Sequence, residues 1–391
     1  MARAGLGSEW RCLFANDIDQ VKAATYEANW TGSDFHKGDI AALRASNIPG
    51  LADLAWASFP CQDLSLAGHG LGIGSEASAC RTRSGSFWAF TRVIRDLIED
   101  ERAPGMIVLE NVVGLLTGKE GRDFATVGQA LSELGYRFGA IVLDASHFVP
   151  QSRPRVFVIA VRRFGRIPRG LRLDGPVQPW HPDLLVRAVR GFDRRTAERW
   201  IWWNPGEAPV RRSTLADMVS DTPCGAVWNP EAETAKLIGM MSGLNIKRLD
   251  AAKRSGLRTI GSLHLRTRPT SQGRKLRAEI NFEPTAGCLR TPKGGCSRAR
   301  VIVVEGQRVR TRLLSPQEGC RLMGLPEDYR LPDYYESAFR VLGDGLVVPA
   351  VSFLRERILE RIELPARWRR DAAWIRYRPT EPFAQPVSKA A

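Results

Sequence analysis

Residues 51–62 read LADLAWASFPCQ, and this stretch decides the fold. Its nearly continuous apolar run is typical of a buried parallel strand. Proline donates no backbone hydrogen bond and restricts the residue before it, so Pro60 ends the strand and Cys61 opens a loop. Open α/β sheets bind their ligands at the carboxyl ends of strands. The sequence therefore places a thiol where a ligand is expected.

Two more apolar runs end in polar clusters. Residues 106–109 lead to Glu110-Asn111-Val112, and residues 140–143 lead to Gln151-Ser152-Arg153-Pro154-Arg155. Arg153 and Arg155 alternate on an extended segment, so their side chains should point to one face. A thiol, a carboxylate and two guanidinium groups at strand ends predict a reaction centre.

Apolar runs and helical patterns alternate between residues 10 and 160, which is the βαβα pattern of a doubly wound α/β sheet. We expect strands at 10–15, 51–58, 106–109, 138–143 and 156–161, and helices at 19–29, 87–99 and 124–134.

The alternation breaks from Arg162 onward. Pro, Gly, Trp and Arg crowd together at 166–170 and 200–206, which favours an irregular or β-rich module. Residues 301–310 predict a hairpin and 349–362 a closing helix. The last residues, 366–391, are typical of a basic tail with little order.

The positive charge of the chain is concentrated in its middle. Residues 1–160 carry a net charge of −3, residues 161–310 carry +16 and residues 311–391 carry +2, within a total of +15. Nucleic acid is the natural partner of such a region, because each neutralised phosphate releases counterions. Arginine prevails over lysine there, and its planar fork suits phosphates and guanine edges. A solubilising surface is the alternative interpretation.

Composition excludes several classes of protein. No apolar stretch approaches the roughly 20 residues of a membrane span, and the N-terminus lacks the regions of a signal peptide. The seven cysteines form no CxxC pair, which favours a reducing cytosol and argues against structural zinc.

In order and spacing, Pro60-Cys61-Gln62, Glu110-Asn111-Val112 and Gln151-x-Arg153-x-Arg155 resemble the central motifs of DNA (cytosine-5) methyltransferases. Gly343–Pro349 adds a fourth motif, although Asp344 stands where that family usually has asparagine. The resemblance covers roughly residues 1–160 and 280–355.

The resemblance implies a Rossmann-like catalytic domain with a smaller, β-rich and basic target-recognition domain inserted. We expect the catalytic and cofactor-binding domain at 1–165, the target-recognition domain at 166–342, a return to the catalytic domain at 343–365 and a flexible tail at 366–391.

The resemblance also assigns the catalytic residues. Cys61 would be the nucleophile that adds to carbon 6 of cytosine, because a thiolate is strongly nucleophilic even at modest population. Glu110 would protonate ring nitrogen 3, while Arg153 and Arg155 would order the nucleophile, the base and a nearby phosphate. The alternatives are an inert buried thiol for Cys61, a helix cap or ion pair for Glu110, and a plain salt bridge for Arg155.

The methyl donor implied by the resemblance is S-adenosylmethionine, with no metal. Asp17 would bind the ribose hydroxyls, Ile18 would pack on the adenine, and Asp39 would accept from the adenine amino group. The remaining residues expected along the cofactor are Ile40, Pro60 and Asp344.

Double-stranded DNA is the implied substrate, and its target base must be flipped out of the duplex. The glycine-rich residues 63–86 resemble the loop that closes over that base, although a merely flexible surface loop is the alternative. The residues expected to contact DNA are Gln62, Ser65, Arg81, Arg83 and Gln151.

The chain departs from the family pattern at its start. A strand ending in Phe-x-Gly-x-Gly, which would cradle the methionine part of the cofactor, should precede Asn16 by about 25 residues, but the sequence opens at Met1. We therefore expect a catalytic domain that lacks its first strand, through a start placed too late or through degradation.

These observations predict a monomeric bacterial or phage enzyme, cytoplasmic and acting at the nucleoid. It would act alone or beside a cognate restriction endonuclease. The alternatives are a non-enzymatic DNA-binding relic and an RNA cytosine-5 methyltransferase.

Overall fold

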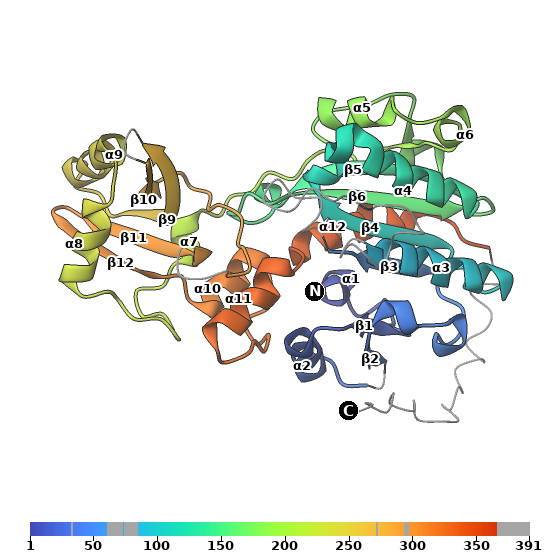
Figure 1. Ribbon diagram of the computed structural model, residues 1–391, viewed down its shortest axis with the longest axis horizontal. Coiled ribbons are helices and arrows are strands. Elements are labelled where there is room, and N and C mark those ends of the chain that lie inside the picture. Colours follow the sequence, from blue (N-terminus) through green and yellow to red (C-terminus); the bar gives the residue numbers. More distant parts are fainter. Residues whose placement is uncertain (33, 61–72, 74–84, 271–272, 293–296, 366–391) are drawn as a thin grey trace.

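Four strands form the main sheet of the larger lobe, in the order β3-β4-β6-β5 (Figure 1). The computed structural model describes the chain except residues 33, 61–72, 74–84, 271–272, 293–296 and 366–391. Strand β3 (Leu54–Ser58) runs parallel to β4 (Met106–Val112). Strand β6 (Pro154–Arg162) lies between β4 and β5 (Tyr136–Asp144), antiparallel to both. The sheet is therefore mixed.

Helices cover both faces of this sheet, as the doubly wound interpretation predicts. On one face α3 (Ser86–Glu99) and α4 (Arg122–Glu133) bury their apolar sides. On the other face α12 (Val348–Arg357) packs closely on the short α1 (Ala2–Leu6). The first residues of the chain and the segment of α12 thus both contribute to the larger lobe, and the fold is an α/β Rossmann-like one.

A second, two-stranded parallel sheet lies apart from the main one. Strand β1 (Ala15–Asp17) pairs with β2 (Phe35–Lys37), and α2 (Gln20–Asn29) connects them. The strand expected at 10–15 thus begins only at Ala15. Among the described strands, β1 has β2 as its sole partner and β3 has β4 alone. The doubly wound sheet is therefore divided into two pieces.

Residues 166–203 pack on the larger lobe and not within the inserted domain, contrary to the boundary expected at 166. This segment includes α5 (Asp183–Val189) and α6 (Arg194–Ala197), which lie over α4 and β5 in Figure 1. The backbone of residues 199–201 pairs with Phe138 of β5. Trp203, one of the aromatic residues that made this segment look irregular, is a buried core residue, and so is Trp180.

The smaller lobe holds a four-stranded antiparallel sheet in the order β10-β9-β11-β12. The strands are β9 (Thr259–Thr270), β10 (Gly273–Asn281), β11 (Arg300–Glu305) and β12 (Arg308–Leu313), and the last two confirm the hairpin expected at 301–310. Helices α8 (Glu231–Gly239) and α9 (Gly243–Arg254) cover one face with their own apolar cluster.

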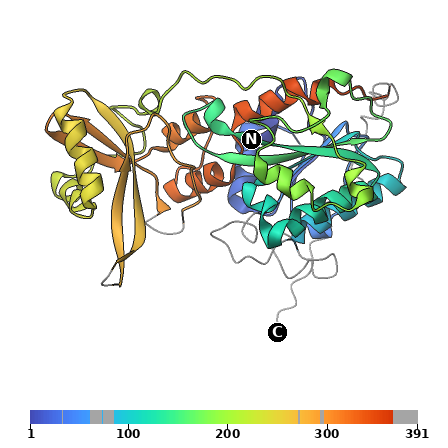
Figure 2. The ribbon, with the colours of Figure 1, turned by 90° about the horizontal axis from the view of Figure 1, so that it is seen from above.

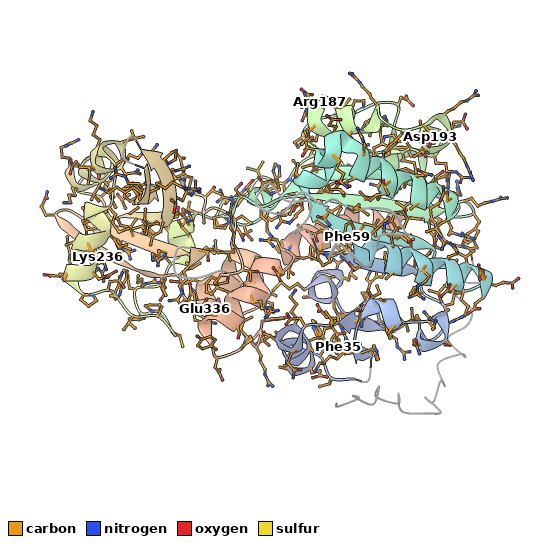
Figure 3. The ribbon with its side chains drawn as sticks, in the orientation of Figure 1. Phe35, Phe59, Arg187, Asp193, Lys236 and Glu336 are labelled. Carbon is orange, nitrogen blue, oxygen red and sulfur yellow. The ribbon has the colours of Figure 1, made fainter. Side chains whose placement is uncertain are left out.

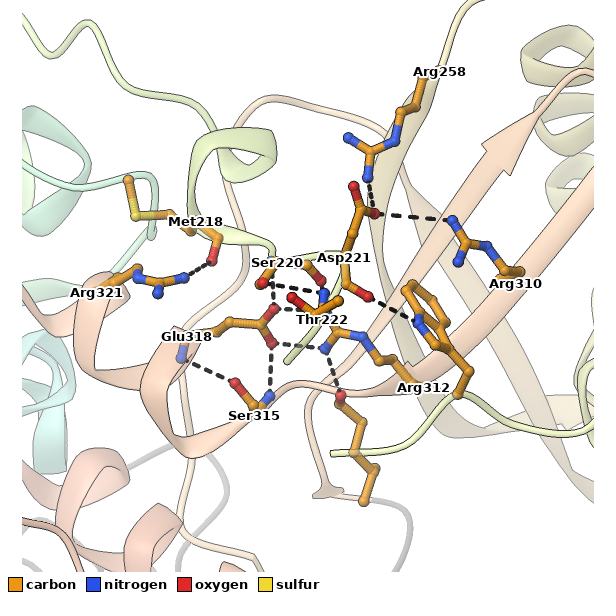
Figure 4. A network of polar contacts seen from close by, with 12 residues as sticks. Met218, Ser220, Asp221, Thr222, Arg258, Arg310, Arg312, Ser315, Glu318 and Arg321 are labelled. Carbon is orange, nitrogen blue, oxygen red and sulfur yellow. Dashed lines mark hydrogen bonds and ion pairs between the residues drawn. The ribbon is translucent and has the colours of Figure 1, made fainter. Parts of the chain in front are cut away.

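A buried ion pair joins the two lobes. The guanidinium of Arg312, at the end of β12, donates to both carboxylate oxygens of Glu318 at 2.6 and 2.7 Å. Glu318 belongs to α10 (Pro316–Met323), and both side chains are almost fully buried. The backbone of Ser220, which follows α7 (Leu215–Met218), bonds to both partners (Figure 4). Removing one partner of such a pair costs about 3–5 kcal/mol.

Contrary to the expectation that no apolar stretch approaches a membrane span, residues 335–361 have the length and apolar composition of one. They form α11 (Tyr335–Asp344), α12 and the short 3₁₀ turn Leu359–Arg361, and more than half of their apolar window is buried. Their burial inside the larger lobe identifies them as core helices.

The approach of residues 199–203 to β5 depends on Gly139. A Cβ atom at this position would lie 1.9 Å from the carbonyl oxygen of Ile201, so the backbone would have to shift. We expect Gly139→Ala to lower the free energy of unfolding by about 2 kcal/mol in urea denaturation.

Gly239→Ala is the matched control, because a Cβ atom there meets nothing within 4 Å at the end of α8. Its effect should stay within about 0.5 kcal/mol. Equal stability of the two variants would contradict the packing of 199–203 on β5.

Candidate active site

Glu110 and Arg155 form an ion pair at the carboxyl end of β4. The Oε1 atom of Glu110 lies 3.1 Å from Nε of Arg155, and the two side chains are 10% and 16% exposed. Arg155 sits opposite Val112 in the antiparallel register of β4 and β6, close enough to reach back to the carboxylate. The structure thus brings together two of the predicted catalytic residues, through an ion pair of the kind that was the alternative interpretation of each.

Asn111 fixes the end of β3 beside this pair. Its amide nitrogen donates to the carbonyl oxygen of Phe59 at 3.0 Å, and Ser58 pairs in parallel register with Glu110. Phe59 is buried against Phe87, at the centre of the larger lobe (Figure 3). Pro60, the residue before Cys61, therefore follows directly from a strand end that is held next to Glu110.

Several predicted residues lie outside the described part of the chain: Cys61, Gln62, Ser65, Arg81 and Arg83. Ile73 is the one described residue between 61 and 84, and it is fully buried in the core that contains Phe87. Its backbone nitrogen donates to a carboxylate oxygen of Asp123 in α4 at 3.0 Å. The middle of this segment is thereby attached to the larger lobe.

Arg153 is buried, and its guanidinium contacts two segments that are distant from it in sequence. It donates to the carbonyl oxygens of Leu289, Gly343 and Gly345 at 2.9, 2.7 and 2.7 Å, and to the Cys288 sulfur at 3.1 Å. Burial, and then the neighbouring Arg155, lower the pKa of Arg153. These contacts make Arg153 a positioning residue in this structure.

Arg153 and Arg155 line one small apolar recess, as the prediction of a shared face requires. Apolar side chains of the main sheet and of the return segment complete its wall. These are Leu143, Ala145, Phe157, Leu346, Val347 and Ala350.

Gln151 is fully buried, so it is not the surface residue that a DNA contact would need. Its amide nitrogen donates to the carbonyl oxygen of Leu322 at 2.8 Å, and its side-chain oxygen accepts from the nitrogen of Leu289 at 2.9 Å. Gln151 therefore connects α10 to Leu289, which lies between β10 and β11. Its position in a motif gave no signal of this burial.

The residues predicted for the nucleoside lie together at the carboxyl ends of β1 and β2. The nitrogen of Gly38 donates to the carbonyl oxygen of Asp17, which brings the turn of Asp39 beside that of Asp17. One carboxylate oxygen of each aspartate caps its own turn, at Asp19 and Ala41. Ile18 is 65% exposed, so its apolar side chain is open to a planar ligand. Ile40 opens the turn after Asp39 and is partly buried.

Asp344 is engaged with neighbouring residues. Its carboxylate accepts from the Thr291 hydroxyl at 2.6 Å and pairs with Lys22 of α2 at 2.9 Å. Burial opposes ionisation, but Lys22 and Thr291 outweigh it and lower the pKa of Asp344. Asp344, at the end of α11, thus joins this part of the chain to α2.

The described residues contain no group of three or more His, Cys, Asp or Glu side chains able to hold a metal ion.

Comparison with known proteins identifies the class of this site. The model of the C-5 cytosine-specific DNA methylase family matches residues 2–360. The chain therefore belongs to this family, as the sequence motifs predicted.

The relatives by sequence are bacterial enzymes named as type II methyltransferases. The chain is 35% identical over 355 residues to M.BsuFI of Bacillus subtilis, covering 90% of this chain and 68% of that protein. It is 26% identical over 369 residues to M.NgoBI of Neisseria gonorrhoeae, covering 94% and 91%.

Solved structures share the fold. A Dnmt2 methyltransferase from S. pombe superposes with a TM-score of 0.52 at 16% identity, over 90% of this chain and 91% of that one. The methyltransferase EhMeth of Entamoeba histolytica gives a TM-score of 0.50 at 13% identity, over 89% of each chain.

The burial of Arg153 predicts a structural penalty for its loss. Arg153→Met would leave the carbonyl groups of Leu289, Gly343 and Gly345 without their donor. We expect the free energy of unfolding in urea to fall by about 3 kcal/mol. Arg166→Met is the control, because its ion pair with Glu363 is exposed and should contribute less than about 0.5 kcal/mol. Similar stability of both variants would refute the positioning role of Arg153.

Proposed function

We propose that this protein methylates carbon 5 of cytosine in double-stranded DNA, with S-adenosylmethionine as methyl donor and a covalent adduct between Cys61 and the base. The observation that carries the proposal is the ion pair of Glu110 and Arg155, held beside the strand end that leads to Cys61. Membership of the C-5 cytosine-specific DNA methylase family supports the same reaction.

Each protein group has a distinct task in this reaction. The Cys61 thiolate adds to carbon 6 of the flipped base, while Glu110 hydrogen-bonds to ring nitrogen 3 as that atom gains a proton. Carbon 5 thereby becomes nucleophilic and can accept a methyl cation equivalent, which S-adenosylmethionine supplies when bound. The carbon 5 proton then passes to water, the bond between sulfur and carbon 6 breaks to release the thiolate, and the proton that nitrogen 3 gained from Glu110 returns to it, which restores the aromatic ring. Arg155 holds the carboxylate of Glu110 in place throughout.

The residues at the ends of β1 and β2 fit the nucleoside half of S-adenosylmethionine. Asp17 would accept from the ribose hydroxyls and Asp39 from the adenine amino group, with Ile18 packed on the ring and Ile40 beside it. The exposed side chain of Ile18 between two carboxylate-bearing turns supports this assignment. Pro60 and Asp344 would lie at the cofactor's edge.

Duplex DNA would lie against both lobes. The excess positive charge of residues 161–310 supports a polyanionic partner. Ser65, Gln62, Arg81 and Arg83, in the segment that carries the nucleophile, would contact the DNA backbone. We place the target-recognition domain in the smaller lobe, from about residue 214 to 313.

The type II names of the relatives support a bacterial restriction-modification setting. We propose a monomer that acts on the DNA of the bacterial cytoplasm, with a cognate endonuclease as its possible genetic neighbour.

Replacement of the nucleophile tests the covalent route. Cys61→Ser should abolish methyl transfer to duplex DNA from labelled S-adenosylmethionine, since a serine hydroxyl near its normal pKa cannot replace a thiolate. DNA affinity should stay within a few fold, because phosphate contacts survive. Substantial turnover by the serine variant would exclude Cys61 as nucleophile. DNA containing 5-fluorocytosine should trap the active protein as an adduct that maps to Cys61.

The divided sheet makes a prediction about cofactor affinity. A parallel strand ending in Phe-x-Gly-x-Gly could pair with the edges of both β1 and β3, and its turn would cradle the methionine half. By calorimetric titration, residues 1–391 should bind S-adenosylmethionine weakly, and a form with such a strand before Met1 should bind it much more tightly. DNA affinity should change little.

The same titration separates the enzyme from the second candidate, a DNA-binding protein without turnover, which the divided sheet favours. That candidate would bind DNA, but no cofactor, in both forms. Micromolar binding by residues 1–391 alone would contradict the need for the additional strand.

A further inference from the structure

The hairpin of β9 and β10 projects from the smaller lobe as a two-stranded ribbon (Figure 2). Its base is anchored, because Leu263, Ala278 and Ile280 are buried against α8 and α9. Its outer part is solvated and basic. The cations of the outer part are Arg266, Arg268, Arg274, Lys275 and Arg277.

The strand register places like charges directly opposite each other. Arg266 pairs with Arg277, and Arg268 pairs with Lys275. Directly opposed residues of an antiparallel pair lie on one face, and residues two positions apart share that face. These four residues therefore form one surface, which we call the cationic face. Like charges in this arrangement destabilise a hairpin.

One carboxylate partly offsets this repulsion. Glu279 lies on the same face and accepts from Arg268 at 2.6 and 2.9 Å, while Arg266 approaches it to 3.5 Å. The hydrogen bond from Arg268 lowers the pKa of Glu279, so the carboxylate is ionised at neutral pH. Two of the four cations thus contact the one anion among the described residues of the hairpin, and the cationic face keeps a positive excess.

The cationic face continues the side of the sheet that meets the larger lobe. Along β9 the same face presents Ile260, which packs in the core cluster that joins the two lobes. His264 follows it, and a Cβ atom at Gly287 would lie 3.4 Å from its imidazole. Gly287 precedes Cys288, whose sulfur accepts from Arg153. The face is therefore on the side of the catalytic segments and not on the α8–α9 side.

Positive charge surrounds the inner end of this face as well. Burial, and then the charges of Arg266 and Arg290, lower the pKa of His264. Arg290 lies between β10 and β11, two residues after Cys288. An extended anion would therefore meet cations from Arg268 and Lys275 down to Arg290.

Binding of a DNA duplex accounts for these features better than a merely solubilising role of the charges does. A two-stranded ribbon fits the major groove, which is about 12 Å wide. Arginine and lysine on adjacent strands can bind phosphates spaced along the backbone, and their mutual repulsion is relieved when they do.

We propose that the cationic face (Arg266, Arg268, Lys275 and Arg277) binds the phosphate backbone of duplex DNA, and that Glu279 is an internal counter-anion that DNA phosphates displace. This inference rests on the proposed function, because it takes DNA as the substrate. It assigns phosphate contacts to the β9–β10 hairpin of the smaller lobe.

Salt-dependent binding tests the inference on the full chain. Fluorescence anisotropy with a labelled cytosine-containing duplex would be measured between 50 and 200 mM salt. Arg268→Ala and Lys275→Ala should each weaken binding about tenfold at low salt. Each should also reduce the slope of log affinity against log salt by about 1. Arg194→Ala on α6 is the matched control, since Arg194 is exposed and pairs only with Glu198 among the described residues.

Glu279→Gln should change DNA affinity in the opposite direction, which distinguishes lost phosphate contacts from structural damage. Removing the internal anion frees Arg268 and Arg266 for phosphate, so DNA affinity should rise several-fold and the salt slope should steepen. The free protein should melt at a lower temperature, because the like charges lose their offset. A merely misfolded hairpin would lose DNA affinity in this variant.

The outcomes show whether the cationic face, the proposed function or both are wrong. If the unaltered chain binds DNA but Arg268→Ala and Lys275→Ala match Arg194→Ala, the cationic face is overturned and the proposed function stands. If the unaltered chain binds no DNA, both fail. If an RNA duplex binds more tightly than DNA with the same sensitivity to these variants, the assignment to DNA is overturned.

Discussion

The guanidinium of Arg153 is the interaction on which the site depends. Among the described residues no carboxylate forms an ion pair with it, and it is held by three backbone carbonyl groups and a sulfur atom. Burying a cation is costly unless its donors are satisfied, so these acceptors must stay in place for the larger lobe to close. They belong to residues 288–289, which precede β11, and to residues 343–345, at the end of α11. One side chain thus joins the main sheet to both of these segments.

The same principle governs the junction of the lobes. Arg312 and Glu318 are buried together, and each also bonds to the backbone of a neighbouring segment. Gln151 performs the equivalent task with neutral groups. A buried polar group that loses its hydrogen-bond partner destabilises the fold. These contacts therefore fix one arrangement of the lobes. The exposed ion pairs, such as Arg194 with Glu198, cannot supply such a constraint.

The sequence predicted the elements of the larger lobe well, because its strands are apolar runs and its helices are periodic. It did not predict the antiparallel direction of β6, since a strand buried on both faces has the same composition in either direction. Strand β2 is only three residues long and carries no pattern. Residues 166–203 were assigned to the wrong lobe, because Trp180 and Trp203 stand among arginines and prolines. Motif spacing predicted one reaction centre that contains Glu110 and Arg155, but it predicted neither their mutual ion pair nor the burial of Gln151.

Arginine serves three physical purposes in this chain, and only burial and partners distinguish them. Arg153 has most of its donors occupied by backbone carbonyl groups, so it cannot also bind a phosphate. Arg155 is mostly buried as well, but it pairs with one carboxylate, that of Glu110, and not with backbone carbonyl groups of distant segments. Arg266 and Arg268 are about half exposed and share a single anion, so a polyanion can compete for them. The net charge of a segment therefore predicts a partner only after the buried arginines have been set apart.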